Sequence, residues 1–192
     1  EDSSPVKVMN PAKADVDYVV KGIGNGLTAP HDLECESDVK ALVWLLSESV
    51  AQRLRESRLR CRTISVGARW ARDLTGYSRQ TTVRVPTCLT RDIANFAMGL
   101  LRANQPFDKD HALRAIHVRV TNLVPMDVPV QCDLFGDAAE VVRMERLDLA
   151  IDALRVRFGN TCVKRAVELT DDVMSGLDIK RDNTVHPIGF LR

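Results

Sequence analysis

The amino-acid sequence predicts an α+β (α/β) fold, in which two helices cover one face of a four-stranded sheet in β-α-β-β-α-β order, followed by a C-terminal helix and tail. Two observations lead to this prediction. Four segments alternate apolar with polar residues, and two longer segments between them repeat apolar residues at three- and four-residue spacing. At 192 residues the chain can hold one domain with appendages or two very small domains. Two helices can cover only one face of four strands, so we expect the other face to be open.

The first predicted strand covers residues 21–28 and is rich in glycine. Ile23 and Leu27 point to one face, and the small residues point to the other, namely Gly22, Gly24, Gly26 and Thr28. Such a strand lets another backbone or a ligand approach closely. Its start is similar to a dinucleotide-binding glycine motif, but Pro30 follows where that motif needs a helix. We therefore expect no Rossmann fold, and we expect Pro30 to end the strand.

Two helices are predicted from single apolar stripes. The first begins at Ser37 or Asp38 and reaches about Ser57. Its stripe consists of Val39, Leu42, Val43, Leu46, Val50 and Leu54. The second begins at Thr90 and ends near Asn104. Its stripe consists of Ile93, Phe96, Ala97, Leu100 and Leu101.

The other three strands are predicted from alternation, over residues 60–66, 78–85 and 113–120, with a hairpin connection at residues 72–76. The residues expected to face the core are Ile64, Val66, Val83, Val85, Ile116, Val118 and Val120. The residues between them in the strands are polar or basic, so the open face should suit water and phosphate.

Charge is unevenly distributed along the chain. The totals are 27 basic and 26 acidic residues, for a net charge of +1, but nine arginines and only two acids lie between Arg53 and Arg84. The planar guanidinium group suits phosphate. The sequence therefore favours a nucleic acid backbone on the open face, and the lack of aromatic residues there disfavours a stacking platform for single strands. The alternative is a solvated basic face of an ordinary domain.

The residues expected to contact nucleic acid are those on or beside this face. They are Lys21, Gly22, Gly24, Asn25, Thr28, Arg62, Thr63, Ser65, Ser78, Arg79, Gln80, Thr82, Arg84, Arg114, His117 and Arg119.

No catalytic or metal-binding residues and no cofactor are predicted within this sequence. The acidic pair Asp171 and Asp172 lies in a segment without periodicity, and we expect it to be solvated. The five cysteines are widely spaced and the four histidines never stand four residues apart, so neither a disulfide framework nor a zinc site is indicated. A reducing environment is expected. No stretch approaches the roughly 18 to 20 apolar residues of a membrane span.

Residues 125–136 are predicted to form an exposed connector, because Pro125 and Pro129 disfavour a helix. The connector contains the motif Gln131-Cys132-Asp133-Leu134-Phe135. Two adjacent large apolar side chains in water favour a partner with an apolar cleft; alternatively, Leu134 and Phe135 fold back onto the core of the domain. A third helix is then predicted over residues 141–158, with an apolar stripe of Leu147, Ile151, Leu154 and Phe158.

Several segments together resemble the little-finger domain of Y-family translesion DNA polymerases, of the DinB or DNA polymerase IV type, also called the ImpB/MucB/SamB group. They are Lys21-Gly22-Ile23-Gly24-Asn25, the helix from Asp38 to Ala51, Arg62-Thr63-Ile64-Ser65-Val66, and Arg114-Ala115-Ile116-His117-Val118-Arg119-Val120. The Gln-x-x-Leu-Phe motif resembles the peptide with which bacterial replication proteins bind the sliding clamp. Residues 147–159 resemble a tail helix that follows this peptide in some bacterial members.

The resemblance implies a linker at residues 1–20, a DNA-binding little finger at 21–124, a clamp-binding connector at 125–136, and a helix and tail at 137–192. It implies double-stranded primer–template DNA and the sliding clamp as partners, no membrane, and a location in the cytoplasm at the bacterial nucleoid. Gln131, Leu134 and Phe135 would contact the clamp. The chain does not begin with Met, which suggests a piece of a longer DNA polymerase whose palm, before Glu1, holds the catalytic acids and Mg2+. The alternative is a non-catalytic homologue that acts as an adaptor between clamp and repair proteins, and a third possibility is an unrelated RNA-binding ferredoxin-like domain.

Overall fold

The computed structural model describes residues 20–129 and 138–179 of the chain. Most of the predicted linker, the motif Gln131-Cys132-Asp133-Leu134-Phe135 and the end of the predicted tail lie outside the described residues. In the described part, the elements follow the predicted β-α-β-β-α-β order and a C-terminal helix comes after them. The elements of the sheet domain are β1 (Gly22–Leu33), α1 (Glu36–Glu56), β2 (Leu59–Trp70), β3 (Gly76–Thr87), α2 (Thr90–Arg102) and β4 (Leu113–Pro125).

The four strands form one antiparallel sheet in the order β1-β4-β2-β3. The last strand in sequence, β4, therefore lies between β1 and β2, and β1 and β3 are the two edges. The prediction that Pro30 ends the first strand is wrong, since β1 continues to Leu33. Pro30 is tolerated because β1 is an edge strand and its register with β4 shifts between Thr28 and Leu33.

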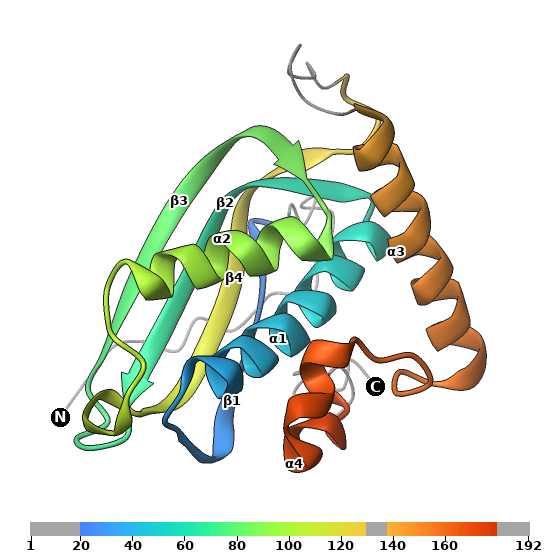
Figure 1. Cartoon of the computed structure of the whole chain (residues 1–192). Coiled ribbons are helices and arrows are strands. Elements are labelled where there is room, and N and C mark those ends of the chain that lie inside the picture. The colour runs from blue at the N-terminus through green and yellow to red at the C-terminus, as the bar shows by residue number, and fades with distance from the viewer. Residues whose placement is uncertain (1–19, 130–137, 180–192) are drawn as a thin grey trace, which may run out of the picture.

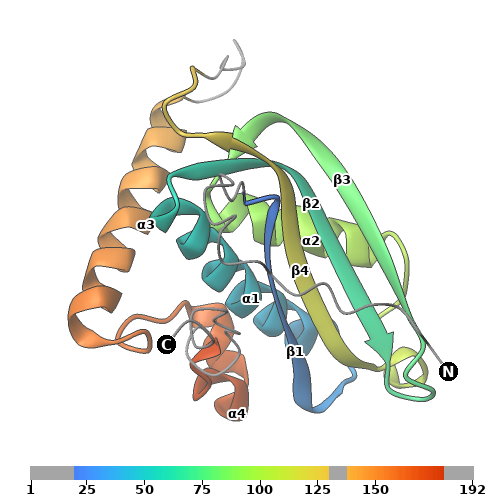
Figure 2. The same ribbon diagram turned by 180° about the vertical axis from the view of Figure 1, so that it is seen from behind.

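Both long helices of the domain pack against the same face of the sheet, as Figure 1 shows from the helix side and Figure 2 from the sheet side. The core lies between them. Large side chains that are almost completely buried come from both layers, among them Leu42, Leu46, Leu54, Ile64, Ile93, Leu101 and Ile116. Two predicted core positions are exposed instead, Phe96 and Val85. Val85 lies where the register of the edge strand β3 with β2 shifts, between Thr82 and Thr87, which interrupts the alternation that buries Val83.

The third long helix, α3 (Ala138–Phe158), packs alongside α1 with its polar side inward. The guanidinium of Arg55 on α1 donates to Asp152 at 2.6 and 2.9 Å and to Asp148 at 3.2 Å. Arg155 donates to Glu48 of α1 at 2.5 Å. An apolar stripe of a helix ordinarily packs on the core. Here buried ion pairs attach the helix, and the predicted stripe is left largely exposed.

The rest of the described chain forms two short helical segments, η3 (Ala166–Thr170) and α4 (Asp172–Ser175). They lie against α1 and the start of the sheet, and Met174 and Ile179 are buried in the common core. Arg165, just before η3, donates to both Glu48 and Asp148 and so joins this segment to α1 and α3. No helix in the described ranges is both long and apolar enough to cross a membrane.

Candidate nucleic-acid interface

The face of the sheet opposite the helices is polar, and the strand register arranges its residues in four rows. Each row runs from β1 through β4 and β2 to β3. The rows are Gly22, Thr121, Thr63 and Thr82; Gly24, Arg119, Ser65 and Gln80; Gly26, His117, Gly67 and Ser78; Thr28, Ala115, Arg69 and Gly76. No described element covers this face (Figure 2). The sheet therefore brings most of the predicted contact residues onto one open surface, which we call the open face.

Arg84 is exposed on β3, in the register shift that lies beyond Thr82, the last residue of the rows on this strand. Lys21 is exposed immediately before β1. Arg62 is exposed at the register shift between Cys61 and Thr63.

Asn25 does not lie on the open face, contrary to the prediction. It pairs with Val118, whose side chain is buried in the core. Its amide nitrogen donates to the hydroxyl of Ser49 on α1 at 3.0 Å. Asn25 therefore connects β1 to the helix layer.

Arg79 projects to the helix side, and Arg114 lies at a register shift of β4. Arg79 pairs with the buried Val66 and donates to the side-chain oxygen of Asn104, after the end of α2, at 2.7 Å. Arg114 precedes the open-face residue Ala115 and forms an ion pair with Asp32 at 3.2 Å. Both arginines were predicted from their charge. Strand alternation gives Arg79 the opposite side from Gln80, whereas the register shift between Leu113 and Ala115 removes Arg114 from the alternation.

Arg69 belongs to the open face but was not among the predicted contact residues. The sequence prediction ended its strand at Val66, whereas β2 continues to Trp70. The signal was present, because the alternation that includes Thr63 and Ser65 continues through Gly67 to Arg69.

Glycines of the open face make room for side chains of β4. A Cβ atom on Gly67 would lie 1.8 Å from Cε1 of His117, so the imidazole ring lies directly over this glycine. A Cβ atom on Gly24 would lie 3.1 Å from Cβ of Arg119. We expected the glycines of the first strand to admit another backbone or a ligand, but the side chain of Arg119 already occupies the space beside Gly24.

The centre of the open face is electropositive. Burial is the main cause that lowers the pKa of His117, and the charges of Arg69 and Arg119 lower it further. Neither arginine forms an ion pair with a residue in the described ranges. Two exposed guanidinium groups beside a neutral imidazole thus form a surface that can accept phosphate oxygens.

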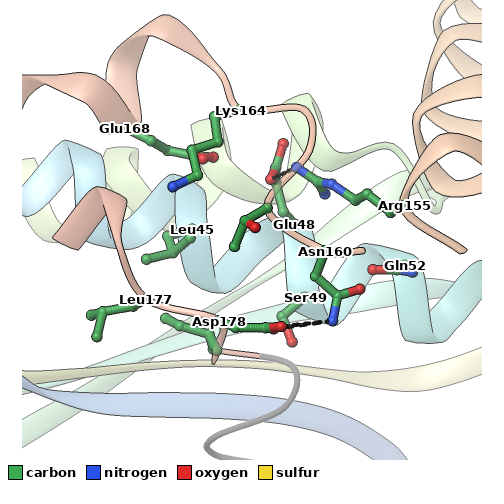
Figure 3. A pocket seen from close by; sticks show the side chains of 12 residues that line it. Leu45, Glu48, Ser49, Gln52, Arg155, Asn160, Lys164, Glu168, Leu177 and Asp178 are labelled. Carbon is green, nitrogen blue, oxygen red and sulfur yellow. Dashed lines mark hydrogen bonds and ion pairs between the residues drawn. The ribbon is translucent and has the colours of Figure 1, made fainter. Parts of the chain in front are cut away.

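A second polar site lies between α1 and the C-terminal segments, where Figure 3 shows a pocket. Asn160 donates to the carboxylate of Asp178 at 3.0 Å, and Arg155 pairs with Glu48 on the wall of the pocket. Burial and the nearby Glu48 raise the pKa of Glu168 to about 8, so this carboxyl group is largely protonated at neutral pH. The residues that line the pocket attach the C-terminal segment to α1. They include no nucleophile with an adjacent general base.

Metal binding finds no support in the described part of the chain, where no group of three or more His, Cys, Asp or Glu residues is placed to hold an ion. Asp171 has a structural role. Its carboxylate accepts hydrogen bonds from the backbone of Val173 and Met174 at the start of α4, and it lies 2.5 Å from Nε2 of His31. The other predicted contact site, formed by Gln131, Leu134 and Phe135, lies outside the described residues.

Comparison with known proteins places the sheet domain in a family. The model of the impB/mucB/samB family C-terminal domain matches residues 20–134. The chain is 38% identical over 170 residues to a DNA polymerase IV of Acetivibrio thermocellus, covering 88% of this chain and 41% of that protein. It is 32% identical over 149 residues to DNA polymerase IV 2 of Halalkalibacterium halodurans, covering 77% of this chain and 35% of that protein.

Two further matches are more distant. A putative UV-damage repair protein, UvrX, of Bacillus subtilis is 29% identical over 142 residues, covering 73% of this chain and 33% of that protein. A solved complex of the beta-clamp processivity factor with the little finger domain of PolIV matches at 18% identity and a TM-score of 0.45, covering 60% of this chain and 99% of that one.

The chain spans less than half of the length of the DNA polymerase IV relatives named here. The family match, by contrast, covers the whole four-stranded sheet with α1 and α2. This chain therefore belongs to the impB/mucB/samB family and contains its C-terminal, little-finger domain.

Proposed function

We propose that the open face grips the sugar–phosphate backbone of a DNA duplex without reading bases, and that the chain is the DNA-binding part of a translesion polymerase of the DNA polymerase IV type. The observation that carries this proposal is the pair Arg69 and Arg119. Both are on the open face, they flank His117, and neither has a carboxylate partner among the described residues. The polymerase relatives support the choice of DNA as the ligand.

The chemistry of the open face fits phosphate better than bases. Its neutral members are hydroxyls, an amide and glycines, whose short side chains keep the surface flat. Ser65 already donates its hydroxyl to the backbone oxygen of Arg119, so β2 holds the strand that carries this arginine. The rows contain no aromatic side chain other than the imidazole of His117, which lies over Gly67. Arginines on a flat polar surface favour sequence-independent contacts to the duplex backbone.

Fluorescence anisotropy with a labelled primer–template duplex over a series of salt concentrations tests this proposal. Arg119→Ala and Arg69→Ala should each weaken binding and make the log–log salt dependence shallower by roughly one unit, as expected for one lost phosphate contact. Arg114→Ala and Arg79→Ala are matched controls, because they remove the same charge from arginines outside the four rows that already bond to Asp32 and Asn104.

Equal effects of all four substitutions would mean that only net charge matters and would contradict the assignment of the open face. Tighter binding of a single strand than of a duplex of the same length would contradict the choice of duplex DNA.

A second contact is proposed from the sequence motif in the connector. Gln131 would form hydrogen bonds at the rim of a pocket on the sliding clamp, and Leu134 and Phe135 would fill its apolar floor. Burial of both side chains could contribute on the order of 3 to 6 kcal/mol before the cost of ordering the peptide, which corresponds to a weak contact. The open face and the connector would then hold one chain to DNA and clamp together.

Calorimetry with a purified bacterial clamp tests the second contact. The double substitution Leu134→Ala with Phe135→Ala should abolish clamp binding and leave the melting temperature nearly unchanged. If the double variant unfolds instead, these side chains belong to the core of the domain itself. Neighbouring Asp133→Ala serves as the control, since the motif leaves this position free.

Nucleotide transfer is assigned to the parent protein and not to the residues of this chain. It requires carboxylates that hold metal ions at the transferring phosphate. We propose that these acids and Mg2+ belong to the part of the polymerase for which the relatives have additional length.

A further inference from the structure

One flank of α3, next to the side that packs on the domain, carries an apolar stripe at coiled-coil spacing. Successive members are separated by three, four, three and four residues, namely Met144, Leu147, Ile151, Leu154 and Phe158. This alternation is the a and d pattern of a helix that packs against another helix. Leu147 is 45%, Leu154 42% and Phe158 60% exposed, while Met144 and Ile151 are half-buried, so the outer half of the stripe is open to water.

The charges of α3 are separated by side. Its acids face the domain, where Glu140 pairs with Arg91, Glu145 with Arg60, and Asp148 and Asp152 with Arg55. The arginines Arg143, Arg146 and Arg157 lie on the exposed side. None of these three forms an ion pair with a residue of the described ranges, although Arg157 stacks 4.9 Å above the ring of Phe158.

The heptad positions of α3 also separate its exposed arginines from its buried charged residues. With Met144, Ile151 and Phe158 at a, the two arginines Arg143 and Arg157 stand at g, the position from which coiled coils select a partner by charge. The e positions of the same helix are Asp148 and Arg155, and both are buried against α1. Only one flank of the stripe is therefore available to a partner, and that flank is basic.

We propose that the exposed stripe of α3 is a docking surface for an acidic amphipathic α-helix of another protein. The partner helix would pack apolar side chains against the stripe and place carboxylates opposite Arg143 and Arg157. A second copy of this chain fits poorly, because its e-position residues are engaged within its own domain and its g-position arginines would repel. This surface is separate from the open face, which belongs to the sheet.

Isothermal titration of two designed helical peptides tests the proposal. The peptides carry the same leucine seam, and one has glutamate at its flanking positions while the other has lysine. We expect the acidic peptide to bind at least about tenfold more tightly than the basic one, with the preference falling as salt is raised. Leu154→Ala should weaken binding of the acidic peptide about tenfold, since the seam loses one large apolar contact.

Two controls separate the stripe from the rest of the helix. Val156→Ala removes a side chain that is 80% exposed but lies on the other flank, and it should leave binding unchanged. The pair of substitutions R143E and R157E should reverse the preference toward the basic peptide. All positions changed are exposed or half-exposed, so thermal unfolding of each variant should match that of the unchanged chain.

Equal binding of the two peptides, or no binding of either, would overturn the proposal. So would a dimer in sedimentation equilibrium that Leu154→Ala dissociates, because a second copy would then be the occupant. Binding to vesicles of anionic lipid that outcompetes the acidic peptide would identify the stripe as a membrane surface and would overturn it as well. The peptide-binding results for α3 are independent of the proposed DNA and clamp contacts, which involve other residues.

Discussion

His117 and Gly67 illustrate how single residues shape the open face. The imidazole occupies space that any other residue at position 67 would fill, and this position partly buries the ring. Burial is the first cause of the lowered pKa of His117, followed by the charges of Arg69 and Arg119. A histidine held neutral between two arginines adds no positive charge of its own, so the arginines supply the charge for phosphate binding.

Gly67→Ala should displace the imidazole of His117 into water. The new Cβ atom would lie 1.8 Å from Cε1, and the ring is the movable partner in this contact. Loss of burial should raise the pKa of His117 toward its ordinary value of 6.5. An NMR titration of the ring protons measures this shift. Gly99→Ala on α2 is the control, since nothing lies within 4 Å of its added Cβ; an unchanged His117 pKa in the Gly67 variant would contradict the geometry.

Glu168 should make the stability of the chain depend on pH. Burial and Glu48 raise its pKa in the folded state from 4.5 to about 8, so the folded chain binds a proton that the unfolded chain has lost over this range. The contribution of Glu168 to the free energy of unfolding is fully present below pH 4.5 and is lost as the pH rises to about 8. Urea unfolding at pH 6 and pH 9 should show this loss, and Glu168→Gln should remove it. The same pH dependence in the Gln variant would place its origin elsewhere.

At the scale of elements, α3 differs most from what its sequence pattern predicts. Its apolar stripe is correctly predicted, but periodicity does not reveal which side of a helix meets the domain. That choice depends on Glu48 and Arg55, two charged residues on α1 that sequence patterns treat as solvent-exposed. Both are nearly buried, and they meet Arg155, Asp148 and Asp152 in complementary pairs.

The elements of the sheet domain were predictable because local patterns match their surroundings. The stripes of α1 and α2 face a single core, and alternation in β2 and β4 separates core from open face. Arg79 was chosen for its charge although strand parity, a local signal, assigns it to the helix side. Other predictions failed because they depended on pairing with distant segments: Arg114 lies at a register shift, and Pro30 is tolerated because its strand is at the edge of the sheet.

Arg55→Ala should test how strongly ion pairs attach α3. The substitution leaves the carboxylate of Asp152 without its described ion-pair partner and removes one of the two arginines that pair with the buried Asp148, which costs about 3 to 5 kcal/mol. Urea unfolding of the whole chain measures the change. Arg102→Ala is the control, since its pair with Glu36 is half-exposed and such pairs contribute about 0 to 1 kcal/mol. Similar losses for both variants would mean that the α1–α3 contact contributes little to stability.

At the scale of the whole molecule, the proposed DNA and clamp contacts lie close together along the chain. β4, which carries His117 and Arg119, ends at Pro125, and the Gln-x-x-Leu-Phe motif begins at Gln131. Six residues span at most about 20 Å. The chain between Pro125 and Gln131 is therefore a short tether between the two proposed contacts. Once DNA is bound, this tether keeps the clamp contact at an effective concentration in about the millimolar range. Two weak contacts on one chain can therefore give a stable complex.

Lengthening this tether should weaken binding to a clamp loaded on primer–template DNA. Inserting about forty Gly and Ser residues between Val128 and Pro129 should lower the affinity roughly twentyfold, because the effective concentration falls with the three-halves power of tether length. Anisotropy on clamp-loaded DNA measures this loss. The inserted residues touch neither contact, so affinities for DNA alone and for free clamp should stay the same, which is the internal control. An unchanged affinity for the loaded clamp would mean that one chain does not make both contacts at once, and the clamp would then act on this protein only as a separate binding partner.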